Sequence, residues 1–365
     1  MKLVRAGAAA IGLLLLLLLL ILCSASATVT APDLRVRGNE LVDGPGRGHV
    51  VRLLGVDRSG LEYACIQGSG FFQSEHPMSI DSPAMIRAMK SWDINAVRVP
   101  LNEDCWLGLN GEASLVGAPY RRIVERYVRA LNGAGLYVIL DLHWTGAGPN
   151  AKATGQTPMA DAARAPAFWR SVARTFKNNH ALVFDLFNEP YGISWSCWEH
   201  GCLVPASGSE PGFRSAGMQQ LVNAVRSAGA TQPLMLGGLS YSLDLSGWLS
   251  HEPHDPDHQL VASEHNYGDL APCTGGCKAA ILETHRRVPI VMGELGETDC
   301  GQSYIDSLMA WDDAHGISYL GWAWDATDNG WSCTGGPSLI SNYDGTPTAY
   351  GIGLRNHLRA LAARR

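Results

Sequence analysis

Short, continuously apolar runs alternate along the chain with longer segments whose apolar positions recur at helical spacing. An uninterrupted apolar run is typical of a parallel strand buried on both faces, whereas a half-solvated strand alternates. The pattern predicts strands over Val51–Val56, Ala96–Val99, Tyr137–Leu142, Val183–Phe187, Pro233–Leu236, Leu260–Ser263, Pro289–Gly293 and Ser318–Ala323. It predicts helices over Ser82–Trp92, Ala118–Ala134, Ala165–Lys177, Gly212–Ala228, Ala279–Arg286, Ser303–His315 and Ala349–Ala362.

Eight strands, each followed by a helix or a helix-sized gap, favour an α/β fold of the (β/α)8 or TIM-barrel type. A doubly wound sheet is the alternative, but no glycine-rich dinucleotide turn follows the first predicted strand. Turn residues within Leu34–Val50 predict a short N-terminal hairpin that closes the bottom of the barrel. No linker or repeat divides the chain, so residues 28–365 are expected to form a single domain.

The first residues are expected to lie outside this domain. Lys2 and Arg5 precede an apolar run over Ile11–Leu22, and small residues at Ala25–Ala27 follow it. This order is typical of a secretory signal peptide, which we expect to occupy residues 1–27 and to be removed. The protein is then expected to be secreted, without stable membrane association; an uncleaved anchor is the alternative.

Eight of the nine cysteines follow the expected signal peptide, and an even number in an exported chain favours disulfides. Adjacency of the predicted loops suggests one pairing scheme among many. Zinc is the alternative, because two of these cysteines are four residues apart, but no second Cys/His cluster completes a tetrahedral set. The predicted pairs are Cys65–Cys105, Cys197–Cys202, Cys273–Cys277 and Cys300–Cys333.

Polar and aromatic residues stand at or just beyond the ends of six predicted strands. A packed core does not require them, whereas the active sites of (β/α)8 enzymes form where the strands end. These residues are Arg98, His143, Trp144, Asn188, Glu189, His265, Tyr267, Glu294, Trp322 and Trp324.

Two glutamates, Glu189 and Glu294, end the fourth and seventh predicted strands, about opposite each other around a small barrel. Hydrolysis of a glycosidic bond needs one protonated carboxyl group and one ionised carboxylate, about 5–5.5 Å apart in enzymes that retain configuration. Arg98 is expected to keep Glu294 charged, and a less solvated Glu189 would keep its proton. Either glutamate alone is equally compatible with a surface carboxylate; the pair favours catalysis.

The segment Phe184–Pro190, which contains Asn-Glu-Pro, resembles the signature of glycoside hydrolase family 5, the cellulase family of retaining barrels. The resemblance covers roughly Leu54–Trp331. Its other motifs are Val-Arg-Val-Pro at Arg98, Leu-Asp-Leu-His-Trp at His143, His-Asn-Tyr from His265 to Tyr267, and Met-Gly-Glu at Glu294.

The resemblance implies that Glu189 is the catalytic acid/base and Glu294 the nucleophile. It further implies that Asn188 bonds the sugar 2-hydroxyl, a contact that strengthens in the transition state. Tyr267 would donate a hydrogen bond to the nucleophile, and Arg98 would orient that carboxylate.

By the same resemblance, His143 and His265 would line the subsite of the reacting sugar, although a histidine at a barrel rim is alternatively a packed core residue. A tryptophan after strand eight would stack under that sugar. Trp322 and Trp324 are two residues apart and so would share a face of the strand. Trp324 is the preferred candidate because the loop follows it, with Trp322 in reserve. Trp144 is the preferred further platform for the flat apolar face of a sugar. Other loop tryptophans with this potential are Trp106, Trp195, Trp198 and Trp331.

Charge and composition limit the classes of molecule that the protein is expected to bind. A formal net charge of −6 gives no reason to expect binding to nucleic acid or to an anionic membrane. We expect a monomer acting on a β-linked oligo- or polysaccharide, without metal or organic cofactor. An endo-β-1,4-glucanase is the leading interpretation. The same mechanism on mannan, β-1,3-glucan, xyloglucan or a glycolipid is the alternative, and a non-catalytic glycan-binding barrel is a minor one.

Overall fold

The computed structural model describes residues 30–67, 80–208, 212–268, 273, 275–327 and 332–364. The expected signal peptide and Trp331 lie outside these residues, so the structure does not test either prediction.

Eight parallel strands close into one barrel in the order β10-β11-β12-β13-β4-β5-β6-β7, which confirms the predicted fold. All eight strands are buried along nearly their whole length, as their continuously apolar sequences indicate. Their bounds are β4 (Leu54–Asp57), β5 (Ala96–Asn102), β6 (Tyr137–Trp144), β7 (Leu182–Asp185), β10 (Leu234–Gly237), β11 (Leu260–Tyr267), β12 (Ile290–Gly296) and β13 (Ser318–Gly321).

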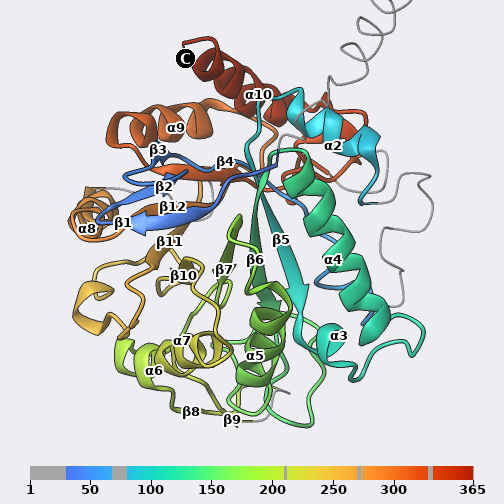
Figure 1. Cartoon of the computed structure of the whole chain (residues 1–365), viewed down its shortest axis with the longest axis vertical. Helices are drawn as coiled ribbons and strands as arrows, with labels where there is room; N and C mark the ends of the chain where they lie inside the picture. Colours follow the sequence, from blue (N-terminus) through green and yellow to red (C-terminus); the bar gives the residue numbers. More distant parts are fainter. Residues whose placement is uncertain are drawn as a thin grey trace, which may run out of the picture.

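Helices surround the strands (Figure 1). Their starts follow local signals: the Ser82 side chain caps α2, which has proline at its first position, and Thr348 caps α10. The helices of this layer are α2 (Pro83–Lys90), α4 (Ala118–Gly133), α5 (Ala165–Phe176), α7 (Met218–Arg226), α8 (Gly275–His285), α9 (Ser303–His315) and α10 (Ala349–Ala362).

Several short elements in the loops were not predicted. One predicted helix, Gly212–Ala228, begins only at Met218, because Phe213–Arg214 instead pairs with Leu203–Val204. The additional elements are α3 (Glu103–Leu107), α6 (Trp195–His200), the 3-10 turn η1 (Leu249–His251), and the ribbons β8 (Leu203–Val204) with β9 (Phe213–Arg214) and β14 (Ile340–Asn342) with β15 (Thr346–Pro347).

A small antiparallel sheet closes the bottom of the barrel, as predicted, but it has three strands rather than a simple hairpin. These are β1 (Leu34–Arg37), β2 (Glu40–Asp43) and β3 (His49–Val51). Leu34 and Leu41 pack against buried residues of the barrel strands, including Met235 and Val261. The sheet therefore seals the apolar end of the barrel interior from water.

The four predicted cysteine pairs are all disulfide-bonded. Cys65–Cys105 and Cys300–Cys333 close chain separations of 40 and 33 residues, and the other two close separations of 5 and 4. The four disulfides join loop residues to one another or to residues of helices α3, α6 and α8, rather than joining neighbouring barrel strands. They therefore constrain the connections around the barrel.

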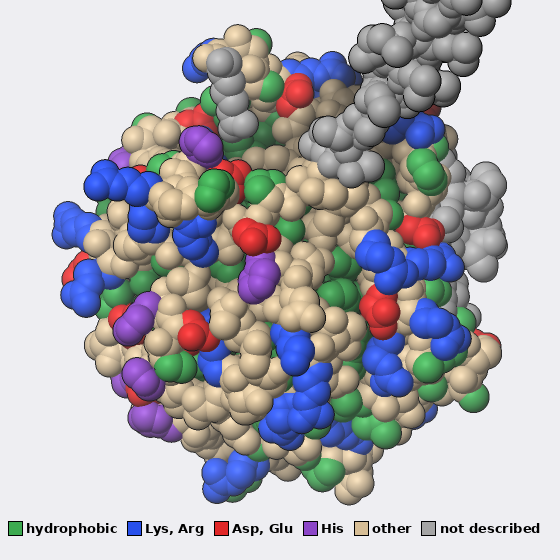
Figure 2. Space-filling view, viewed as in Figure 1, with side chains coloured by type: hydrophobic (Ala, Val, Ile, Leu, Met, Phe, Trp, Pro, Cys, Tyr) green, Lys and Arg blue, Asp and Glu red, His purple; other side chains and the backbone are tan. Residues whose placement is uncertain are grey.

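On the face seen in Figure 2, basic side chains are distributed widely with acidic ones between them. None of the helices that the structure describes combines the length and apolar character needed to cross a bilayer.

The closing sheet provides a stability prediction. Leu41 is 3% exposed beneath the barrel, whereas Val50 in the same sheet is 56% exposed. Leu41→Ala should lower the free energy of unfolding by about 3 kcal/mol, because it removes buried methyl groups and leaves a cavity. Urea denaturation of both variants would show this, with Val50→Ala within about 0.5 kcal/mol of the parent. Equal losses in the two variants would contradict the inferred packing.

Candidate active site

A cavity of about 520 Å³ opens at the carboxyl ends of the barrel strands. It brings together residues from both halves of the chain, including both predicted catalytic glutamates. Its lining residues are His143, Gln156, Glu189, Ser240, Tyr241, Leu243, His265, Tyr267, Glu294 and Trp322.

Arg98 of β5 lies fully buried below this cavity and contacts carboxylates from four strands. Its Nη1 donates to Glu294 Oε1 at 2.7 Å and to Asp57 Oδ1 at 3.0 Å. Its Nε donates to Asp185 Oδ2 at 2.9 Å, and Nη2 lies 3.0 Å from Asp141 Oδ2. A guanidinium suits this position because its five N–H groups point outward in a fixed plane.

Arg98 and the His143 ring, which lies beside Asp141, are together fewer than the four buried carboxylates, so protonation of part of this acidic set is favoured. Burial raises the pKa of Asp57 and Asp185 well above the usual value, and nearby Glu294 and Asp141 raise both further, against the opposing charge of Arg98. The neutral forms of Asp57 and Asp185 are therefore favoured. The positive charge of Arg98 remains available to Glu294.

Glu294 of β12 is held at both carboxylate oxygens. Oε1 accepts from Arg98, and Oε2 accepts from the Tyr267 hydroxyl of β11 at 2.6 Å. Burial and the adjacent Glu294 and Glu189 raise the pKa of Tyr267 well above 10, so its hydroxyl remains a donor. These contacts stabilise an ionised and oriented Glu294.

Glu189 lies just beyond the end of β7, in different surroundings. Its Oε1 is 2.9 Å from His265 Nδ1, and its Oε2 accepts from Gln156 Nε2 at 2.5 Å. Burial raises the pKa of Glu189 above its usual value, although His143, Gln156 and Arg98 oppose this effect. The raised pKa of Glu189 is the property that a catalytic acid requires.

The two glutamates approach each other closely. One carboxylate oxygen of Glu189, one of Glu294 and a ring nitrogen of His265 all lie within 4.8 Å of one another. Retaining enzymes place their carboxyl groups about 5–5.5 Å apart, and inverting enzymes place them about 6.5–9.5 Å apart. The approach of these oxygens favours the retaining arrangement.

The two histidines carry different charges. Burial lowers the pKa of His265 to about 4, so its ring is neutral near neutral pH. Burial also acts to lower the pKa of His143, but Asp141, whose Oδ2 is 2.6 Å from His143 Nδ1, raises it to about 9. His143 is therefore an imidazolium on the cavity floor and His265 an uncharged neighbour of Glu189.

Asn188 presents an unused donor beside the glutamates. Its Oδ1 accepts from Arg98 Nη2 at 2.7 Å, which fixes the orientation of the amide. Its Nδ2 is buried and has no hydrogen-bond partner among the described residues. The contact with the sugar 2-hydroxyl that the resemblance implies for Asn188 stays a prediction.

The preference for Trp324 over Trp322 was wrong as regards position. Trp324 is fully buried and packs edge-on against Trp92, with ring centroids 4.8 Å apart. Trp322 lines the cavity and stacks on His143 at 5.5 Å with an interplanar angle of 13°. β13 ends at Gly321, so the alternation of side chains along a strand does not extend to these residues.

The other tryptophan candidates among the described residues do not line this cavity. Trp144 is half-buried and lies against Tyr63, with ring centroids 6.1 Å apart. Trp106 and Trp198 are fully buried, and Trp195 packs edge-on against Trp198. An aromatic residue that does line the cavity, Tyr241, was not predicted.

Tyr241 is presented by an unusual turn after β10. Ser240, Tyr241 and Ser242 have φ values of 55°, 60° and 62°, a left-handed run that costs roughly 1–2 kcal/mol per residue. Ser242 Oγ donates to the backbone oxygen of Asn188, and the ring of Tyr241 stacks on Tyr191 at 4.5 Å. The turn holds an exposed aromatic ring beside Glu189, a type of position where backbone strain is often functional.

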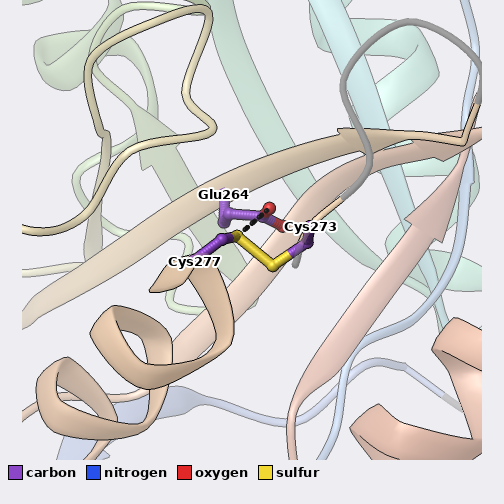
Figure 3. Close-up of side chains that lie close together, drawn as sticks. All are labelled: Glu264, Cys273 and Cys277. Atoms are coloured by element: carbon purple, nitrogen blue, oxygen red, sulfur yellow. Dashed lines mark hydrogen bonds between the residues drawn. A yellow bond between two sulfur atoms is a disulfide. The ribbon is translucent and has the colours of Figure 1, made fainter. Parts of the chain in front are cut away.

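Two groups of side chains have ligand atoms close enough for a metal ion. In the first, Cys273 and Cys277 form a disulfide beside Glu264, so neither sulfur is a thiolate ligand (Figure 3). The second is Glu189, His265 and Glu294. Its carboxylates already accept from Arg98, Tyr267 and Gln156, so those oxygens serve the hydrogen-bond network described above.

Comparison with known proteins agrees with this architecture. A family profile described as cellulase (glycosyl hydrolase family 5) matches residues 57–328. A manganese-dependent endoglucanase of Phanerodontia chrysosporium is 28% identical over 54% of this chain and 46% of its own length. A mannan endo-1,4-beta-mannosidase of Streptomyces lividans is 27% identical over 41% of this chain and 37% of its own length. The matches thus span less than half of these curated relatives.

Among solved structures, a beta-glucanase of Saccharophagus degradans superposes with a TM-score of 0.66 at 20% identity. The superposition covers 94% of this chain and 96% of that one. This likeness concerns the fold, whereas the family profile spans both glutamates and the strands that carry the Arg98 cluster. The chain belongs to glycosyl hydrolase family 5, the cellulase family.

Proposed function

We propose that this protein is a retaining β-glycoside hydrolase that cleaves internal β-1,4-glucan linkages. The observation that carries the proposal is the approach of Glu189 and Glu294 to within 4.8 Å, each with the environment that its role requires. A carboxylate held by Arg98 and Tyr267 faces a carboxyl group whose pKa is raised by burial.

In the first step, Glu294 attacks the anomeric carbon while Glu189 gives its proton to the glycosidic oxygen, so the leaving sugar departs as an alcohol. Asn188 Nδ2 is available to bond the 2-hydroxyl of the reacting sugar. Trp322, held against the His143 imidazolium, offers its ring to the apolar face of that sugar.

In the second step, Glu189 is ionised and removes a proton from water, and the resulting hydroxide equivalent displaces Glu294 from the anomeric carbon. The free enzyme is restored with the original configuration at the sugar. His265 is uncharged near neutral pH, so it contacts Glu189 without adding a positive charge that would weaken the base.

The proposed substrate is inferred from the residues that line the cavity and from the substrates of the relatives. The relatives include endoglucanases and mannan endo-1,4-beta-mannosidases, and the Saccharophagus degradans beta-glucanase has been solved with cellotetraose. A linear β-1,4-glucan is proposed because the cavity lining includes two aromatic rings, Trp322 and Tyr241, that could contact its sugar faces. A β-1,4-mannan, whose reacting sugar differs at the 2-hydroxyl near Asn188, is the second candidate.

We also propose that the protein is exported from the cytosol. Eight cysteines form four disulfides in the described part of the chain, and such bonds persist in oxidising environments outside the cytosol. The apolar run over Ile11–Leu22 is proposed as the signal that directs export.

Glu189→Ala should lose activity according to the leaving group. Hydrolysis of cello-oligosaccharides should fall by roughly 10³-fold, whereas dinitrophenyl cellobioside, whose leaving group needs no protonation, should still form the glycosyl-enzyme quickly. Added azide should then yield a β-glycosyl azide, because it replaces the water that Glu189 would have activated. Steady-state kinetics and product NMR would measure both effects; equal losses on the two substrates would exclude Glu189 as the acid.

Glu294→Gly should abolish turnover of both substrate types, since no covalent intermediate forms. Azide is small enough to enter from the vacated face and should give the α-configured product from an activated β-glycosyl fluoride. A circular dichroism spectrum and unfolding midpoint similar to those of the parent would serve as the folding control. A β-configured azide product would assign the nucleophile to another residue.

A substrate panel tests the specificity. Carboxymethyl cellulose and mixed-linkage β-glucan should lose viscosity faster than they release reducing ends, which is the pattern of internal cleavage. On galactose-free β-1,4-mannan, kcat/KM should be at least tenfold lower. Chromatography of the oligosaccharide products would record chain lengths, and preferred cleavage of mannan would move the assignment to the second candidate.

A further inference from the structure

Gln156 occupies a position that the two-glutamate mechanism leaves unexplained. It lies in the loop between β6 and α5, and its exposed side chain donates from Nε2 to Glu189 Oε2 at 2.5 Å. The other oxygen of Glu189 is next to His265. In the free protein, therefore, both oxygens of the acid/base have a hydrogen-bonding neighbour from a separate element.

An N–H donor favours the ionised form of a carboxyl group and lowers its pKa, as Gln156 does here. This suits the second chemical step, in which Glu189 must be a base. It opposes the first step, in which Glu189 must hold a proton and pass it to the glycosidic oxygen. A fixed Gln156 contact would thus help one half of the reaction and hinder the other.

A second cavity next to Gln156 could accept its side chain after displacement. Gln156 lines the catalytic cavity and also a second cavity of about 360 Å³, whose wall includes Lys152, Thr154 and Tyr191. Because Gln156 is exposed, rotation from one cavity into the other breaks little packing. Polar groups in the second cavity can form hydrogen bonds with the displaced amide.

We propose that Gln156 is a mobile positioning residue, which rests on Glu189 in the free and covalent enzyme forms and is displaced into the second cavity by the leaving sugar. The proposal rests on the proposed function. Displacement removes a donor from Glu189 Oε2 when the substrate arrives, so the acid keeps its proton until the glycosidic oxygen accepts it. When the leaving sugar departs, Gln156 returns and favours the carboxylate that deprotonates water.

The proposed displacement of Gln156 predicts a difference between the pH profiles of kcat/KM and kcat. The basic limb of kcat/KM reports the acid in the free enzyme, and that of kcat reports it in the substrate complex. With a cello-oligosaccharide, for which formation of the glycosyl-enzyme limits turnover, the kcat/KM limb should lie at lower pH than the kcat limb. The donor is present in the first state and absent in the second.

Gln156→Leu should raise the kcat/KM limb by roughly half a pH unit and leave the kcat limb in place, so the two limbs converge. Gln156→Glu should raise the kcat/KM limb further, because a carboxylate beside Glu189 disfavours its ionised form. Thr154→Val, which changes the second cavity without touching Glu189, should keep the separation of the parent. Stopped assays over a pH series would measure all four proteins.

Three results would overturn the proposal: no separation of the limbs in the parent, an unchanged kcat/KM limb in Gln156→Leu, or an equal shift of both limbs. The outcome is separable from the assignment of Glu189 itself. If Glu189→Ala shows the leaving-group dependence and azide product described above while Gln156→Leu leaves the limbs apart, the acid/base assignment stands and only the role of Gln156 is wrong.

Discussion

The site depends on the placement of one buried guanidinium among carboxylates that outnumber it. Arg98 contacts Asp57, Asp141, Asp185 and Glu294, and all five groups are nearly inaccessible to water. Burying a charge without compensation is costly, so this cluster is stable only if the cation is retained and part of the acidic set is protonated. Glu294 gains an oriented positive partner from this arrangement without meeting solvent counter-ions.

Backbone irregularities then bring side chains from neighbouring strands into contact. The pairing of β11 with β12 shifts after Glu264, so that His265 lies opposite Glu294 and Gly293 is passed over. A Cβ atom at Gly293 would lie 2.7 Å from His265 Nε2 and from Ser263 Oγ, closer than such atoms approach. The glycine thus admits the imidazole ring beside the nucleophile, and bulges of this kind commonly redirect side chains near active sites.

The sequence predicted the parts of this arrangement that follow from strand periodicity. Strand ends located Arg98, Glu189 and Glu294, because the carboxyl ends of parallel strands meet on one face. Asp57 and Asp185 were missed, since a single acid within an apolar run does not reveal which cation it will meet. Gln156 was missed because nothing in the local pattern of its loop fixes the path of the chain.

Trp322 shows the limit of the same reasoning. Alternation along a strand cannot orient a residue beyond the last paired position, and β13 ends one residue before Trp322. The loop helices were likewise missed: α6 is six residues long and depends on its Ser194 cap, too short for a periodic apolar stripe. Loops are positioned by tertiary contacts, and sequence patterning carries little information about these.

The two glutamates are oriented by different parts of the fold. This difference separates the residues that would determine the reaction from those that would determine which substrate is accepted. Glu294 is immobilised by Arg98 and Tyr267, both of which belong to barrel strands. Glu189 lies beyond its strand and meets a loop residue, Gln156. Loops tolerate substitution far better than a buried cluster of charges, because their side chains face solvent. Substitutions in the loop that carries Gln156 could therefore change the surroundings of Glu189 while the Arg98 and Tyr267 contacts of Glu294 stay in place.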